Sequence, residues 1–87
     1  MKMIILIVKD NDADLLTQAF TGGDLRVTRI ASTGGFLRSG VATMLVGVED
    51  PQVDGVIQLV RKTLPTLGSG EKRATLFVVP VQRFEQV

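Results

Sequence analysis

The sequence predicts an α+β fold with the element order strand, helix, strand, strand, helix, strand. Four apolar or alternating runs have the length of strands, and two segments between them carry apolar residues at spacings of three and four. Glycine, proline and aspartate stand at most of the junctions, where they end or begin elements. With 87 residues the chain has room for one small domain, which we expect to span residues 1–87.

The first half of the chain is expected to supply two strands with a helix between them. Met3–Val8 is a continuous apolar run, typical of a strand that is buried on both faces. Asp10 and Asp12 are expected to cap the following helix, and Gly22–Gly23 to end it. The apolar stripe of this helix has members three and four positions apart: Ala13, Leu16, Ala19 and Phe20. A second strand is expected over Leu25–Ala31, with apolar and polar residues alternating.

The second half is expected to open with a strand over Val41–Val48. A helix follows, for which Asp50 suits the cap and Pro51 the first helical position. Its apolar stripe consists of Val53, Val56, Ile57, Val60 and Leu64. Pro65 ends this helix.

The last strand is expected over Ala74–Val81, after a connection at Thr66–Lys72 and before the tail Gln82–Val87. The complete order is that of the ferredoxin-like, split βαβ arrangement, βαββαβ: a four-stranded antiparallel sheet with both helices on one face. The first and last strands are apolar along their whole length. We therefore expect the other face of the sheet to be covered as well, most simply by another subunit.

The composition argues against several classes of function. A net charge of +1 provides little attraction for a nucleic-acid polymer or an acidic membrane surface. The chain has no cysteine and no histidine, so it lacks thiolate metal sites, disulfides and the commonest general base. The first apolar run is too short to span a membrane. We expect a cytoplasmic, non-enzymatic protein without metal or cofactor.

The strongest functional signal lies between the second and third strands. Gly34-Gly35 allows a ligand to approach the backbone closely, and amide N–H groups there can face an anion. Phe36 beside them could stack on a nucleotide base, or could be buried in an ordinary glycine turn. Arg26, Arg29 and Arg38 could each meet a phosphate, although each could equally belong to a solvated strand face. Gly47, near the end of the third strand, is typical of a bulge or of close approach by a ligand.

Several blocks of sequence together resemble a known family. They are Met1–Ile5, Ile7-Val8, Arg26 with Thr28, Ala31–Gly40, Gly47–Asp50, Val53-Asp54, Ala74–Val81 and Phe84–Gln86. These blocks resemble the PII-like cyclic di-AMP receptor proteins. The resemblance extends over almost the whole chain, and the block Thr33–Arg38 is its most specific part.

The resemblance implies a ferredoxin-like homotrimer that binds cyclic di-AMP in clefts between subunits and catalyses no reaction. By matching position, the ligand-binding residues would be Arg26, Thr28, Gly35, Phe36, Leu37, Gly47, Phe77 and Gln86. Phosphate and sugar contacts would come from Arg26, Thr28 and the backbone of residues 35–37. Phe36 would line the adenine pocket, Gly47 would leave room for the ligand, and Phe77 and Gln86 would complete the pocket.

Three departures from the family pattern leave a second hypothesis open. Val41 and Asp24 stand where the family usually has asparagine, and Thr66–Lys72 replaces a longer excursion. A carboxylate at position 24 disfavours a nearby phosphate. The ligand could therefore be a related adenine nucleotide, or the chain could be a ligand-free or differently liganded PII-like scaffold that regulates a protein partner by contact. An ATP-binding PII-type protein fits less well, because the connection Ser32–Gly40 is too short for the regulatory loop of such proteins.

Overall fold

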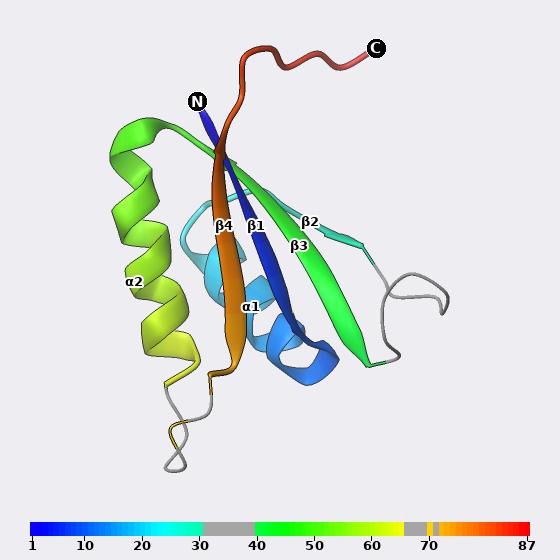
Figure 1. Cartoon of the computed structure of the whole chain (residues 1–87), viewed down its shortest axis with the longest axis vertical. Coiled ribbons are helices and arrows are strands. Elements are labelled where there is room, and N and C mark those ends of the chain that lie inside the picture. The colour runs from blue at the N-terminus through cyan, green and yellow to red at the C-terminus, as the bar shows by residue number, and fades with distance from the viewer. Residues whose placement is uncertain (31–39, 66–69, 71) are drawn as a thin grey trace.

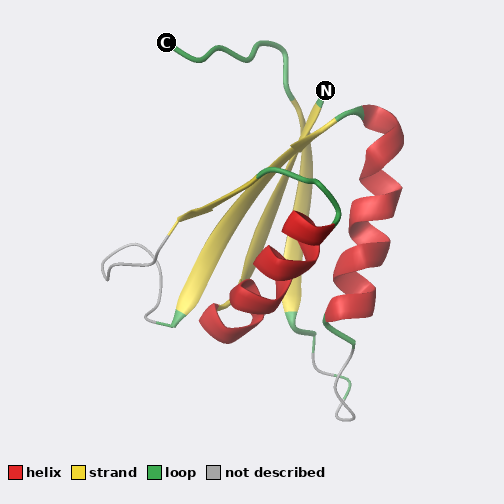
Figure 2. Cartoon of the chain, turned by 180° about the vertical axis from the view of Figure 1, so that it is seen from behind, coloured by secondary structure: helices red, strands yellow, loops and turns green. Residues whose placement is uncertain are grey.

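The protein folds into a two-layer α+β arrangement, which a computed structural model describes for residues 1–30, 40–65, 70 and 72–87. An antiparallel four-stranded sheet with the order β2-β3-β1-β4 forms one layer. Two helices cover one of its faces, as Figures 1 and 2 show from opposite sides. The elements are β1 (Lys2–Lys9), α1 (Asp10–Gly22), β2 (Val27–Ile30), β3 (Val41–Val48), the short 3-10 helix η1 (Asp50–Gln52), α2 (Val53–Thr63) and β4 (Ala74–Pro80). The predicted fold class is confirmed.

The core lies between the helices and the two central strands. β1 and β3 pair over their full lengths, and the register sets Ile4 opposite Val46 and Leu6 opposite Met44. Opposite residues of an antiparallel pair point to the same face. The even-numbered residues of both strands from Ile4 onward are only 0–3% exposed, because they face the helices. Leu16 and Phe20 of α1, together with Val56 and Val60 of α2, close this core from the other side.

The start of α1 differs from the sequence prediction. The residue before the helix is Lys9, and no side chain caps it, so the prediction that Asp10 and Asp12 cap this helix was wrong. The physical reason is that β1 runs directly into α1, and the backbone N–H of Asp10 donates to the carbonyl of Gly40 at 2.8 Å. Both aspartates lie in the first turn, where carboxylates complement the helix dipole. Asp12 is 8% exposed and accepts a hydrogen bond of 2.7 Å from Nη2 of Arg73.

The start of the second helical segment also differs, by one residue. Glu49, not Asp50, occupies the capping position of η1. Its side chain accepts from the backbone N–H of Gln52, while Oε1 of Gln52 accepts from the N–H of Glu49 at 2.8 Å. This reciprocal pair satisfies two amides that have no partner within the helix. Pro51 lies in the first turn, as predicted, and Asp50 lies 3.4 Å from the amino group of Met1.

β2 is shorter than the predicted Leu25–Ala31. The N–H of Leu25 donates to the carbonyl of Phe20 at 2.9 Å, which holds this residue at the end of α1. Asp24 before it has a φ of 63°, in the left-handed region that aspartate and asparagine tolerate better than most residues. The strand consequently begins at Val27, and the predicted last residue, Ala31, lies outside the described residues.

Candidate nucleotide site on the open sheet face

The face of the sheet opposite the helices is apolar. Odd-numbered residues of β1, β3 and β4 and even-numbered residues of β2 point to it, and Met3, Ile5 and Ile7 of β1 are half-buried. The register places Ile5 between Leu45 of β3 and Phe77 of β4. Phe77 is 50% exposed, although its surroundings on this face are apolar. This face therefore carries core-type side chains that neither helix of the described chain covers.

A cavity of about 350 Å³ lies at one end of this open face. It is lined by Met1, Met3, Arg26, Thr28, Leu45, Gly47, Val81, Phe84 and Gln86. The strand register explains why distant residues meet here, since Met3 pairs with Gly47 and Thr28 pairs with Leu45. The C-terminal tail joins them because the N–H of Val81 donates to the carbonyl of Met1 at 3.1 Å. Figure 1 shows both chain ends at this end of the sheet.

The two arginines at β2 have different environments. Arg26 is exposed and lines the cavity, and it forms no ion pair with any of the described residues. Arg29 instead bonds to the carboxylate of Asp14, and its Nη2 lies 3.6 Å from Oδ1 of Asp10. The hydrogen bond to Asp14 raises the pKa of Arg29 above its ordinary value. Of these two cations, Arg26 is thus the one positioned to receive an anion in the cavity.

Within the described chain, the fold does not require glycine at position 47. β3 pairs continuously with β1 from Val41 to Val48, so the bulge considered for Gly47 is absent. A Cβ atom added at Gly47 would meet only Cε of Met1 at 3.5 Å, an ordinary contact. The absence of a side chain here leaves space in the wall of the cavity, where an external ligand can approach the strand closely.

The predicted ligand residues are only partly brought together. Arg26, Thr28, Gly47 and Gln86 line the cavity, whereas Phe77 lies on the same face without lining it. Gly35, Phe36 and Leu37 lie outside the described residues, as does Arg38. The role of all eight residues as ligand contacts stays a prediction.

Sequence reasoning did not assign a role to the apolar part of the cavity wall. These residues are Met1, Met3, Leu45, Val81 and Phe84. The alternation of side chains along a strand could have indicated two of them, because Met3 and Leu45 point to the same face of the sheet as Gly47. No local pattern indicates that Phe84 of the tail lies near the N-terminus.

The departures at Asp24 and Val41 lie at different places. Val41 is half-buried at the opposite end of β3 from Gly47, and it does not line the cavity. Asp24 occupies the left-handed turn between α1 and β2. The left-handed turn favours aspartate or asparagine at position 24, and this preference does not depend on a ligand.

Two further features of the described residues bear on function. Among residues 1–30, 40–65, 70 and 72–87, no three acidic, histidine or cysteine side chains come together in a way that could hold a metal ion. Within the same ranges, no helix has the length and apolar character needed to cross a membrane.

Comparison with known proteins identifies the family. A sequence model of the cyclic-di-AMP receptor family matches residues 1–67, and the chain therefore belongs to this family. A crystal structure of a functionally unknown protein from Pediococcus pentosaceus is similar over 99% of this chain and 96% of that one. The two chains are 34% identical, and the TM-score is 0.78. Membership in a receptor family supports a binding protein rather than an enzyme.

Proposed function

We propose that this protein is a non-catalytic signalling receptor that binds cyclic di-AMP, or a related adenine nucleotide, between the subunits of a homotrimer. The observation that carries the proposal is the cavity on the open face. It gathers Arg26, Thr28, Gly47 and Gln86, which come from three separate parts of the chain: the start of β2, β3 and the C-terminal tail. These are residues to which the family resemblance assigns ligand contacts.

The lining of the cavity suits a molecule with phosphates and flat bases. The guanidinium of Arg26 can donate two parallel hydrogen bonds to a phosphate, and the hydroxyl of Thr28 can donate another. The amide of Gln86 offers both a donor and an acceptor, as the edge of adenine requires. Phe84 and the methionines provide apolar surface for the face of a base, a contact worth about 1–3 kcal/mol when an aromatic ring stacks.

A neighbouring copy supplies the remainder of the site in this proposal. The cavity of about 350 Å³ is near the lower end of the usual range for ligand sites, roughly 300–1,000 Å³. The apolar open face that surrounds it is suited to contact with a second copy, because burial of Ile5, Leu45 and Phe77 would remove apolar surface from water. Closure by that copy would deepen the cavity and exclude water from it.

Isothermal titration calorimetry tests the ligand. We expect heat of binding with cyclic di-AMP, a weaker response or none with cyclic di-GMP, and an intermediate response with AMP or ATP. The protein concentration is about 100 μM. A Kd equal to this concentration corresponds to a binding free energy of about −5.5 kcal/mol. If none of these nucleotides releases heat, the proposal fails, and the alternative of a PII-like scaffold that acts by contact with a protein partner replaces it.

A pair of variants tests the site. Arg26→Gln should weaken cyclic di-AMP binding at least about tenfold, because a hydrogen bond to a charged group contributes about 1.5–3 kcal/mol. Arg61→Gln removes the same charge from α2, on the other face of the sheet, and should leave the Kd unchanged. Both variants should keep the molecular mass of the native assembly. If the two variants bind cyclic di-AMP with the same Kd, Arg26 is not part of the site.

A further inference from the structure

The helix layer leaves one strand of the sheet incompletely covered. Ala74, Leu76 and Val78 of β4 point to the helix face, because they pair with residues of β1 that do so. Those β1 partners are Val8, Leu6 and Ile4, which are 0–3% exposed. Val78, in contrast, is 38% exposed, and Ala74 and Leu76 are only half-buried. In Figure 1, α2 lies beyond the outer edge of β4 instead of directly behind it.

Within the described residues, the backbone of β4 is also unpaired along this outer edge. In the described sheet β4 is an edge strand, and β1 is its neighbour. The hydrogen bond from the N–H of Val81 to Met1 continues the β1–β4 register, so odd-numbered residues of β4 bond to β1. The N–H and C=O groups of Ala74, Leu76 and Val78 consequently point outward. Pro80 has the same parity and has no N–H, so it marks the end of the edge that can accept a further strand.

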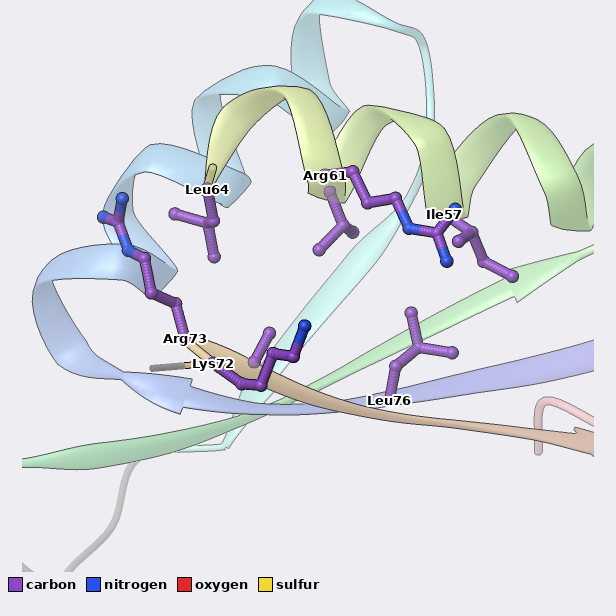
Figure 3. Close-up of a pocket in the computed structure, with 8 residues that line it drawn as sticks. Ile57, Arg61, Leu64, Lys72, Arg73 and Leu76 are labelled. Carbon is purple, nitrogen blue, oxygen red and sulfur yellow. The ribbon is translucent and has the colours of Figure 1, made fainter. Parts of the chain in front are cut away.

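A groove of about 410 Å³ runs between this edge and α2 (Figure 3). Its lining consists of Ile57, Val60, Arg61, Leu64, Lys72, Arg73, Ala74 and Leu76. The uncharged members are all apolar, and the charged members are all cations. The groove therefore combines an apolar floor with a positively charged rim.

The cations of the rim are held in different ways. Arg73 bonds to Asp12 at 2.7 Å, which fixes it beside the start of α1. Arg61 on α2 and Lys72 before β4 are exposed, and neither forms an ion pair with the described residues. Figure 3 shows these two side chains coming from opposite sides of the groove. They are positioned to receive carboxylates from a molecule that lies between α2 and β4.

We propose that the β4 edge and this groove bind an extended, acidic segment of a partner protein, which adds to the sheet as a further strand. Hydrogen bonds to Ala74, Leu76 and Val78 align the segment, as in other strand additions. Alternate side chains of the segment face the groove. The apolar ones lie on its floor, and carboxylates in the same alternation lie beside Arg61 and Lys72. The complementary charge selects acidic over basic segments.

Charge also argues against a second copy of this chain as the occupant. The two edge strands of the sheet are β2, which follows Arg26, and β4, which follows Lys72 and Arg73. Neither strand contains a carboxylate, so a second copy that paired through either edge strand would bring no anion to Arg61 and Lys72. The groove and the nucleotide cavity lie on opposite faces of the sheet, so this proposal does not depend on the ligand of the receptor.

Residue-resolved hydrogen exchange of the native assembly tests whether the edge is free. We expect the amides of Leu76 and Val78 to exchange at least about tenfold faster than those of Phe77 and Val79, which bond to β1. Equal protection of all four amides would show that the edge is already occupied in the assembly, and would overturn the proposal.

A synthetic peptide tests the occupant. The probe is a short, capped, fluorescently labelled peptide, Glu-Thr-Val-Thr-Val-Thr-Glu, in which the two valines and the two glutamates point to one face of the extended chain. Its binding is measured by fluorescence anisotropy. We expect saturable binding that slows exchange at Leu76 and Val78, and no binding of the peptide with lysine in place of glutamate. Failure of the acidic peptide to bind, or equal binding of the basic one, would overturn the proposal.

Matched charge reversals locate the binding. Arg61→Glu should weaken binding of the acidic peptide about tenfold, which corresponds to about 1.4 kcal/mol of binding free energy. Lys62→Glu makes the same change at the adjacent exposed residue of α2, which does not line the groove, and should bind as wild type does. Val78→Pro, which removes one outward N–H, should also weaken binding. If Arg61→Glu and Lys62→Glu bind the peptide equally, the groove is not its site.

Discussion

The two faces of β1 are similarly apolar but have different surroundings. Ile4, Leu6 and Val8 face α1 and α2 and are 0–3% exposed. Met3, Ile5 and Ile7 face away from the helices and are only half-buried. The first face is completed within the chain and stabilises the fold. The second face is suited to contacts between molecules, and a cavity with Arg26, Thr28 and Gly47 interrupts its apolar surface at one end.

The largest expected effect tests the covered face. Leu6→Ala should lower the free energy of unfolding by about 2–5 kcal/mol, because it leaves a cavity in a fully buried site. Urea denaturation measures the loss. Leu15→Ala is the matched control, because Leu15 on α1 is 46% exposed, and it should cost much less. Equal losses would show that the covered face does not dominate stability.

The second prediction tests the open face. Ile5→Glu places a charge between Leu45 and Phe77, where a neighbouring copy is proposed to lie. We expect sedimentation velocity to show a monomer, while far-UV circular dichroism remains close to that of the wild type. Leu15→Glu, on the exposed side of α1, should keep the native mass. An Ile5→Glu protein with unchanged mass would contradict assembly through this face.

The third prediction compares ion pairs that differ in burial. Asp12→Asn should lower Tm, because Arg73 would lose its charged partner at a position where the side-chain exposures are 11% for Asp12 and 22% for Arg73. Asp14→Asn weakens the pair with Arg29, but Asp14 is 64% exposed and Arg29 keeps Asp10. Thermal unfolding of both variants should therefore give the lower Tm for Asp12→Asn. The reverse order would mean that the Asp12–Arg73 pair adds little to stability.

The smallest expected effect on stability is at Gly47. Gly47→Ala should change the free energy of unfolding by no more than about 1 kcal/mol, because the added Cβ meets only Cε of Met1 at an ordinary distance. The same variant should weaken cyclic di-AMP binding if the ligand approaches this strand. Calorimetry and urea denaturation of one protein sample separate the two effects. A large loss of stability would assign Gly47 to the fold instead.

Much of the fold could be predicted from the chain because its signals are local. The apolar runs at β1, β3 and β4 and the helical stripes gave the elements in the right order, with ends that differ by only a few residues. The capping residues were less predictable. Asp10, Asp12 and Asp50 are all good capping residues, but backbone and ion-pair partners from other elements determine their positions.

Residue chemistry alone singled out Arg26 and Gly47 among other candidates, and the family resemblance added Thr28 and Gln86. The matching blocks identified Arg26, Thr28, Gly47 and Gln86, all of which line one cavity. They assigned no role to Phe84, whose place depends on the contact between the tail and the N-terminus.

The order of strands and helices, and the continuous apolar run that makes both faces of β1 apolar, follow from the amino-acid sequence alone. These properties depend on residues within a few positions of one another, so they can be read along the chain. Three other properties come from contacts between distant segments. They are the face that the helices cover, the position of Arg26 rather than Arg29 at the cavity, and the unpaired outer edge of β4 in the described sheet. The reason is that strand register and ion pairs such as Arg73–Asp12, 61 residues apart, form between segments that no local pattern connects.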